Sequence, residues 1–172
     1  MSASLSGLTV QQIRDKARTD AKMVLDGYWY GTPVPVDPFA IARQLGVGVF
    51  SAELGTDAWG MLVGTGSGVD IYLDRDQPTS RFRFSCAHEL GHYVDRGQDV
   101  ADGQAFVDKR SESNVGSVDE IYANEFAASL LMPEPQFSNA VYAGMDNFAL
   151  ANRFDVSLDA VHWRKVHLNL RS

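Results

Sequence analysis

Apolar residues recur at helical spacing in several parts of the chain, separated by glycines, prolines and short polar stretches. Over residues 8–26 this spacing predicts an opening helix that is closed by Gly27. A second, short helix is predicted to begin at Asp37, its N-cap, and to end at Gly46. The proline-rich residues 32–38 should be extended, because proline fixes its own backbone and disfavours helix in the residue before it.

β-Branched and other apolar residues gather in three short runs in the middle of the chain. These runs cover residues 47–50, 60–63 and 69–73, and glycines and short polar stretches separate them. This pattern is typical of strands in a small antiparallel sheet with hairpin-like connections.

Helical periodicity returns in the second half of the chain. One helix is predicted over residues 79–94, with its end at Gly97. Another is predicted over residues 118–132, where Pro133 and Pro135 stop it. Between them, residues 98–116 combine charged residues and glycines with little periodicity, which predicts an exposed loop. Two further short helices are predicted near residues 144–153 and 157–166.

The composition is that of a globular protein. The 172 residues are 45% apolar and 22% charged, which predicts one domain, residues 1–172, with a hydrophobic core. No apolar run approaches the ~20 residues that a membrane-spanning helix needs. The first residues lack the basic start and apolar stretch of a secretory signal, so we expect a cytoplasmic location. The single cysteine, Cys86, fits a reducing compartment and excludes a cysteine-framed zinc site.

The charge balance argues against nucleic acid as the partner. Acidic residues outnumber basic ones by 22 to 15, which gives a formal net charge of −7. Because a phosphate backbone needs a basic surface, this balance does not favour broad nucleic-acid binding. It suits attraction toward a basic protein instead.

The segment His88-Glu89-Leu90-Gly91-His92 is an H-E-x-x-H pattern on a predicted helix. Positions i and i+4 lie one turn apart, so both imidazoles can bind one ion at about 2.0–2.1 Å, the usual zinc distance. Glu89 lies about 100° around the helix, offset from the ligands but able to reach a metal-bound water, as a general base must. Gly91 leaves room for another element near the metal. The alternative is two unrelated histidines on one helix.

Two histidines leave a zinc site incomplete, since a catalytic zinc ion normally has three protein ligands and one water. The next predicted helix offers Asp119, Glu120 and Glu125 as a third ligand, and we select Glu120. Asn124, one turn further on, could hydrogen-bond a ligating histidine and fix its tautomer. The pattern Ser117-x-x-Glu120 is also a capping box, so spacing alone leaves Glu120 open between ligand and cap.

Two linked blocks of sequence, residues 81–92 and 120–133, resemble the ImmA/IrrE family of bacterial and phage metallopeptidases. Weaker similarity extends to residues 36–47 and 150–157, so the resemblance covers most of the chain. Cys86 departs from the family, which commonly has an aliphatic residue there. Its offset from the first histidine points it away from the metal, which predicts a small buried hydrophobe.

The resemblance implies roles for four residues. His88, His92 and Glu120 would be ligands of Zn2+, and Glu89 would be the general base. The fold we expect is α+β and zincin-like, with a small, mainly antiparallel sheet, the histidine helix packed against it, and the glutamate helix closing the site. The expected chemistry is zinc-dependent hydrolysis of a peptide bond.

The sequence does not identify the group that would stabilise the oxyanion of that reaction. Four candidates are near the motif in sequence: Tyr93, Tyr122, Arg81 and Arg83. The sequence does not show which of these side chains points toward the metal. The oligomeric state is also left open.

The resemblance further implies a protein partner, a transcriptional repressor of the helix-turn-helix type, as substrate. Residues 144–168 themselves resemble a helix-turn-helix, so a DNA-binding protein that uses residues 148–166 is one alternative. Residues 153–172 hold four basic residues against two acidic ones, a surplus more typical of a scaffold or protein-docking face. The other alternative is a non-catalytic regulator that keeps the zinc and acts by binding a repressor.

Overall fold

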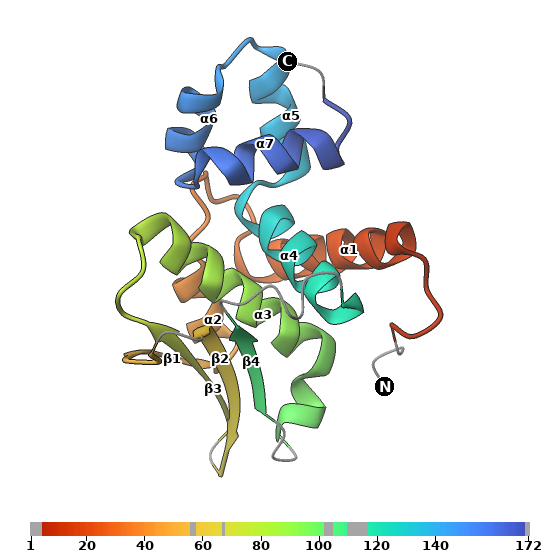
Figure 1. Ribbon diagram of the computed structural model, residues 1–172. Helices are drawn as coiled ribbons and strands as arrows, with labels where there is room; N and C mark the ends of the chain where they lie inside the picture. The colour runs from red at the N-terminus through yellow and green to blue at the C-terminus, as the bar shows by residue number, and fades with distance from the viewer. Residues whose placement is uncertain (1–4, 56–57, 67, 102–104, 110–116, 171–172) are drawn as a thin grey trace.

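The computed structural model describes residues 5–55, 58–66, 68–101, 105–109 and 117–170 (Figure 1). Over these residues the chain forms helices and one four-stranded sheet. The helices are α1 (Val10–Tyr28), α2 (Pro38–Gln44), α3 (Thr79–Ala101), α4 (Val118–Leu131), α5 (Glu134–Tyr142), α6 (Asn147–Phe154) and α7 (Leu158–His167). The strands are β1 (Gly48–Ala52), β2 (Ala58–Thr65), β3 (Gly68–Asp74) and β4 (Ala105–Lys109).

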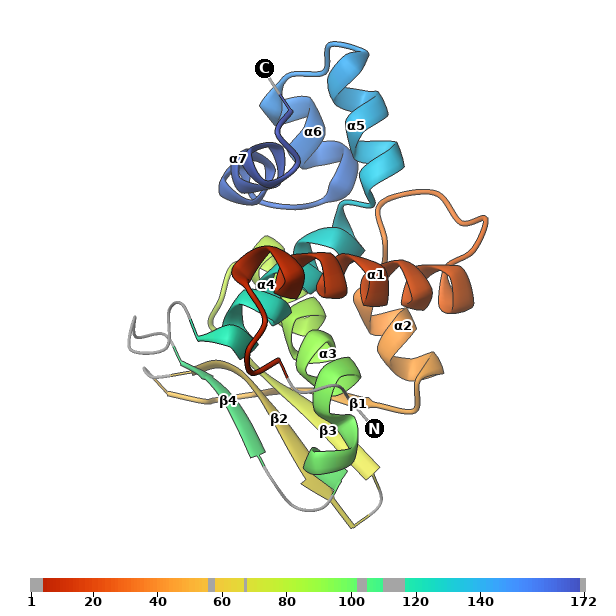
Figure 2. The ribbon, with the colours of Figure 1, turned by 90° about the vertical axis from the view of Figure 1, so that its right-hand side faces the viewer.

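The elements are stacked in layers, and the architecture is α+β as expected. The sheet lies at one end, α3 covers one of its faces, and α1 and α4 pack on the far side of α3 (Figures 1 and 2). Helices α5, α6 and α7 gather at the opposite end from the sheet (Figure 2). Among the described residues, no helix combines the length and the apolar character that crossing a bilayer requires.

The sheet is mainly antiparallel, with the strand order β1-β3-β2-β4. Strand β2 is antiparallel to both of its neighbours, β3 and β4. The expectation of hairpin-like connections is correct for β2 and β3 but wrong for β1, which lies beside β3 and runs parallel to it. A parallel pair needs a long connection, and the stretch between β1 and β3, which contains β2, supplies it.

The exposed loop predicted over residues 98–116 is wrong in its first part. Helix α3 continues to Ala101, and β4 then forms at the edge of the sheet, where Val107 lies opposite Met61 of β2. The pairing is non-local, so the short apolar run in this stretch gives little signal by itself. Residues 102–104 and 110–116 of the predicted loop lie outside the described residues.

Two helix signals in the sequence act as predicted. The Asp37 carboxylate caps α2 by accepting hydrogen bonds from the backbone amides of Phe39 (2.9 Å) and Ala40 (3.2 Å). Gly46, with φ of +75°, ends the same segment. Helix α5, by contrast, is absent from the sequence prediction, in which Pro133 and Pro135 only stop the preceding helix. Pro135 lies in the first turn of α5, where proline is tolerated.

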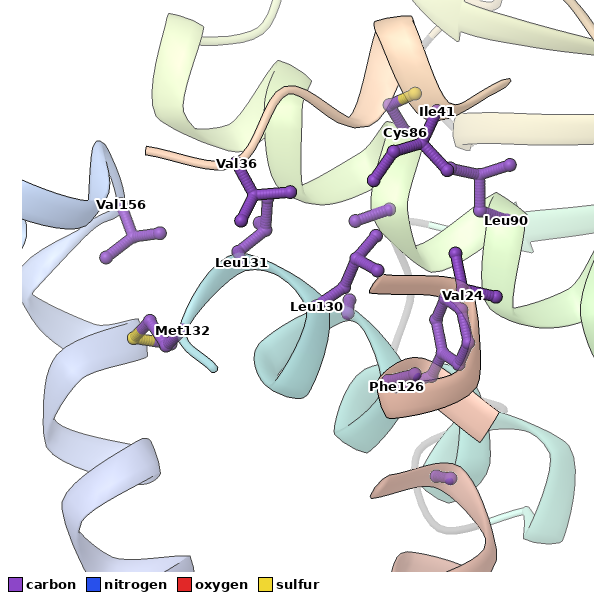
Figure 3. Close-up of a cluster of buried hydrophobic side chains, with 14 of the residues drawn as sticks. Val24, Val36, Ile41, Cys86, Leu90, Phe126, Leu130, Leu131, Met132 and Val156 are labelled. Carbon is purple, nitrogen blue, oxygen red and sulfur yellow. The ribbon is translucent and has the colours of Figure 1, made fainter. Parts of the chain in front are cut away.

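The hydrophobic core holds α3 and α4 in a fixed relation to each other. Cys86 and Leu90 of α3 meet Phe126 and Leu130 of α4 and Val24 of α1, and all five are buried (Figure 3). Cys86 is fully buried, as predicted, and burial raises the pKa of its thiol. The core therefore fixes the distance between the two helices that carry the candidate site.

Candidate metal centre

Helix α3 presents both histidines of the H-E-x-x-H motif on one face. His88 and His92 are 2% and 4% exposed, and their Nε2 atoms are 3.1 Å apart. Regular helical geometry continues past this point and breaks at Arg96, where φ is −133°. The two imidazoles therefore project from a regular stretch of helix, as their spacing predicted.

The start of α4 brings Glu120 to the same point. The Ser117 hydroxyl caps α4 by accepting a hydrogen bond from the backbone amide of Glu120 (3.3 Å). The Glu120 carboxylate is directed to the histidines, with Oε2 3.4 Å from His88 Nε2 and Oε1 3.4 Å from His92 Nε2. The cap thus uses the backbone of Glu120, while its side chain lies among the imidazoles.

The three side chains fit a metal ion. One donor atom from each of His88, His92 and Glu120 lies within 4.8 Å of the other two. The separations of 3.1 and 3.4 Å compare with about 3.3 Å between ligand atoms around a tetrahedral zinc ion. Two imidazoles and a carboxylate are also a donor set that suits zinc and neighbouring transition metals.

Asn124 orients the first histidine. Its side-chain oxygen lies 3.0 Å from His88 Nδ1, so the Nδ1–H of the neutral ring donates to it and Nε2 keeps its lone pair. Burial, followed by the nearby His92, lowers the pKa of His88 to about 3. His88 is therefore in the neutral form that metal binding requires.

Glu89 leaves α3 in a different direction from the histidines and is fully buried. It packs against Gly60 of β2, where a Cβ atom would lie 2.7 Å from Glu89 Oε1 and 3.3 Å from its carboxyl carbon. The carboxylate therefore occupies space that any other residue at position 60 would fill. Sequence reasoning placed Gly60 only in a strand, although a glycine inside a strand pattern is a recognised signal of close backbone approach.

Gly91 allows α3 and α4 to approach closely beside the histidines. A Cβ atom at this position would lie 3.1 Å from Ala123 Cα and 3.2 Å from the Phe126 ring. The prediction that Gly91 makes room for another element is confirmed, and that element is α4.

The other candidate ligands of α4 have different partners. Asp119 forms an ion pair with Arg96. Glu125 is 2% exposed and accepts hydrogen bonds from Arg18 Nε (2.8 Å) and Arg164 Nη1 (3.1 Å). Neither carboxylate joins the histidines, so Glu120 is the one that the fold brings to them.

Three of the four residues considered for oxyanion stabilisation are engaged elsewhere. Tyr122 donates to Asp20 (2.6 Å), Arg83 donates to a backbone carbonyl ahead of α2 (2.6 Å), and Tyr93 packs against the core. Arg81 is exposed at the start of α3, on the same helical face as the histidines.

Comparison with known proteins gives one family and one fold. The family model Peptidase M78, described as the IrrE N-terminal-like domain, matches residues 42–164. Among solved structures, the chain is similar to a Mycobacterium tuberculosis transcriptional regulator, with a TM-score of 0.57 and 17% identity over 90% of this chain and 51% of that one. This likeness shows the fold, and the chain spans about half the length of that regulator. No curated protein matches the chain.

Proposed function

The chain belongs to the Peptidase M78 family, that of the IrrE N-terminal-like domain, and from this membership we propose that it is a zinc-dependent metalloendopeptidase. The observation that carries the proposal is the convergence of His88, His92 and Glu120 on one point, with Glu89 on the adjoining face of α3. This is the arrangement that metal-assisted hydrolysis of a peptide bond requires.

Each residue of the site would have a separate role in hydrolysis. Zinc, when bound, would polarise the scissile carbonyl and lower the pKa of a bound water toward ~7. His88, His92 and Glu120 would hold the metal, and Asn124 would keep the Nε2 lone pair of His88 directed at it. The Glu89 carboxylate would accept a proton from the attacking water and deliver it to the departing amine nitrogen.

The proposed substrate is a helix-turn-helix transcriptional repressor, cleaved in the cytoplasm. The net charge of −7 supports a basic DNA-binding protein as partner, because opposite charge speeds encounter. The structural neighbour is itself named a transcriptional regulator, which supports a role in regulation.

Direct DNA binding by the C-terminal helices is less well supported. Two of the basic residues of α7, Arg164 and Lys165, are buried, at 2% and 9% exposed. Arg164 donates to Glu125, and Lys165 donates to Asn147 at 2.8 Å. These two cations face the interior, so they offer little to a phosphate backbone.

The test is incubation of the zinc-loaded protein with a helix-turn-helix repressor from the same genome, followed by intact-mass analysis. We expect two fragments whose masses sum to that of the repressor plus one water. E89Q should keep its zinc by metal analysis and lose about 10²–10⁴-fold in cleavage rate, because it lacks the base. E53Q, a matched change on an exposed residue, should cleave at the wild-type rate.

Two outcomes would overturn the proposal. Cleavage by E89Q at the wild-type rate would exclude the mechanism. Intact repressor that has nevertheless lost its DNA binding, in the presence of stoichiometric zinc, would favour a non-catalytic regulator instead.

A further inference from the structure

Strand β2 carries one extra residue beside the candidate metal centre. Ala58 and Gly60 pair with adjacent residues of β4, so Trp59 between them is a β-bulge. A bulge bends the strand and redirects a side chain. Here the indole of Trp59 meets α3, and the guanidinium of Arg81 lies over it, 4.9 Å from the ring centroid.

A chain of hydrogen bonds connects the bulge to α3. The side-chain amide of Gln77 donates to the backbone oxygens of Trp59 (3.1 Å) and Asp74 (2.8 Å). The Ser85 hydroxyl, 1% exposed, donates in turn to Gln77 Oε1 (2.9 Å). Because each of these groups is satisfied by another, the position of Trp59 is built into the fold.

The cation–π pair of Arg81 and Trp59 lies in line with the metal ligands. Arg81, His88 and His92 fall on one face of α3, and Arg81 precedes His88 by seven residues, or about 10 Å along the helix axis. On the strand side, Trp59 is next to the glycine against which Glu89 packs. The pair therefore continues the candidate site toward the start of α3.

Arg81 is equipped to bind an anion. Its side chain is exposed, and no carboxylate of the described part of the chain lies within ion-pair distance of it, whereas Arg83 is paired with Asp155 at 3.0 Å. A guanidinium that lies over an aromatic ring can still offer N–H groups for two parallel hydrogen bonds to a carboxylate. The positive end of the α3 dipole lies in the same place.

We propose that Trp59 and Arg81 form a subsite that binds an acidic side chain of the substrate. An extended peptide advances about 3.3 Å per residue, so about 10 Å from the metal ligands places this side chain within about three residues of the scissile bond. The inference rests on the proposed peptidase function, and its first test is independent of cleavage.

The first test follows the indole N–H signal of Trp59 by NMR in metal-free protein. The probes are acetyl-Ala-Asp-Ala-amide and its Asn counterpart, and W59F identifies the signal. We expect the Asp peptide to bind about tenfold or more tightly than the Asn peptide, since a hydrogen bond to a charged group is worth at least that factor. R81Q should remove the difference in affinity between the two peptides. R81K, which keeps the charge but lacks the planar guanidinium, should retain part of that difference.

A matched control removes an equivalent arginine elsewhere. Arg153 of α6 is exposed and lies near the Phe154 ring, with 6.0 Å to its centroid, so R153Q deletes a charge in a similar setting. R153Q should leave the preference for the Asp peptide unchanged. Equal binding of the Asp and Asn peptides by the wild-type protein would overturn the proposal, whether or not the protein cleaves.

The second test uses zinc-loaded protein and a synthetic library of unstructured peptides, with cleavage sites read by mass spectrometry. We expect acidic residues to be enriched at one position within three residues of the cut, and R81E to transfer that enrichment to Lys and Arg. If the Asp peptide binds at Trp59 but no peptide or repressor is cleaved, the peptidase proposal fails and the subsite stands. Cleavage with no acidic enrichment overturns the subsite alone.

Discussion

Glu120 and Glu125 both lie on α4, but their carboxylates have different neighbours. Glu120 lies beside two imidazoles whose Nε2 atoms are each 3.4 Å from its carboxylate, and its side chain is 18% exposed. Within the described parts of the chain, no Lys or Arg lies within ion-pair distance of it. Glu125 is 2% exposed and lies among Arg18, Arg164 and His167.

This difference separates a site from a structural cluster on the same helix. The Glu125 carboxylate is neutralised by cations of the protein, so its interactions are complete without any other group. The Glu120 cluster has three potential metal ligands converging on one point and would be completed by a metal cation from solution. The partners, rather than the residue type, decide which carboxylate can serve chemistry.

Removal of the structural carboxylate should have the largest effect. E125A leaves the Arg164 guanidinium, 2% exposed, without its ion-pair partner, which should lower the free energy of unfolding by about 3–5 kcal/mol. Urea denaturation of metal-free protein measures this, and the zinc affinity of the folded protein should stay within about threefold of wild type. A large loss of zinc affinity with little loss of stability would place Glu125 in the metal site.

E120A should show the reverse pattern. Loss of an outer hydrogen-bond partner costs 10–100-fold in metal affinity, so loss of a direct ligand should lower the zinc affinity by more than about 100-fold. The free energy of unfolding should change little, because the Ser117 cap binds the backbone amide of residue 120, which alanine retains.

S117A is the matched control for that cap. It should cost about 1 kcal/mol of stability and leave most of the zinc affinity, as competition with a chelating dye would show. Full zinc occupancy of E120A at micromolar zinc would exclude Glu120 as a required ligand of the metal.

Asn124 contacts a candidate ligand without binding the metal itself, so its replacement should have a smaller effect on zinc affinity than E120A. N124L removes the oxygen that accepts from His88 Nδ1, which should lower zinc affinity about 10–100-fold. N124D keeps an acceptor at the same place and should retain most of the affinity. Isothermal titration with zinc separates the two variants, and equal affinities would show that the Asn124 contact does not support the metal.

The most gradual effect should be a pH dependence of the stability that belongs to the cluster of His88, His92 and Glu120. In the folded metal-free protein the pKa of His88 is lowered to about 3, against 6.5 when unfolded. The unfolded chain therefore binds the extra proton as the pH falls from 6.5 toward 3, and stability should fall by at most about 1.4 kcal/mol per pH unit in that window. Urea denaturation from pH 7 to 4 should show this fall in the free energy of unfolding in the wild type, and H88Q should lack the part that His88 contributes.

The site was easier to predict from the sequence than the sheet, because its signals are local. His88 and His92 are one turn apart in any helix, and the start of α4 is marked by the Ser117 cap. Spacing alone could not choose between cap and ligand for Glu120. That choice depends on α4 crossing α3 at Gly91, which is a tertiary contact.

The errors in the sheet have the same physical origin. The direction of β1 and the existence of β4 depend on pairing with strands distant in the chain, and a short apolar run carries no information about its partner. Trp59 was overlooked for the same reason, since a bulge is defined only by the strand opposite it. The two histidines and the start of α4 were thus predictable from local sequence, whereas the strands beside them were not.

The Glu125 cluster also constrains how this protein can be divided experimentally. Arg164 lies on α7, and it bonds to Glu125 and to the Ser129 hydroxyl (3.0 Å) of α4. A truncation before α7, the obvious way to delete the helix-turn-helix-like segment, would leave a buried carboxylate short of its partners in the helix that carries Glu120. Inactivity of such a fragment would therefore report on folding, and point substitutions on the exposed side of α7, such as at Trp163, are the cleaner probe of that segment.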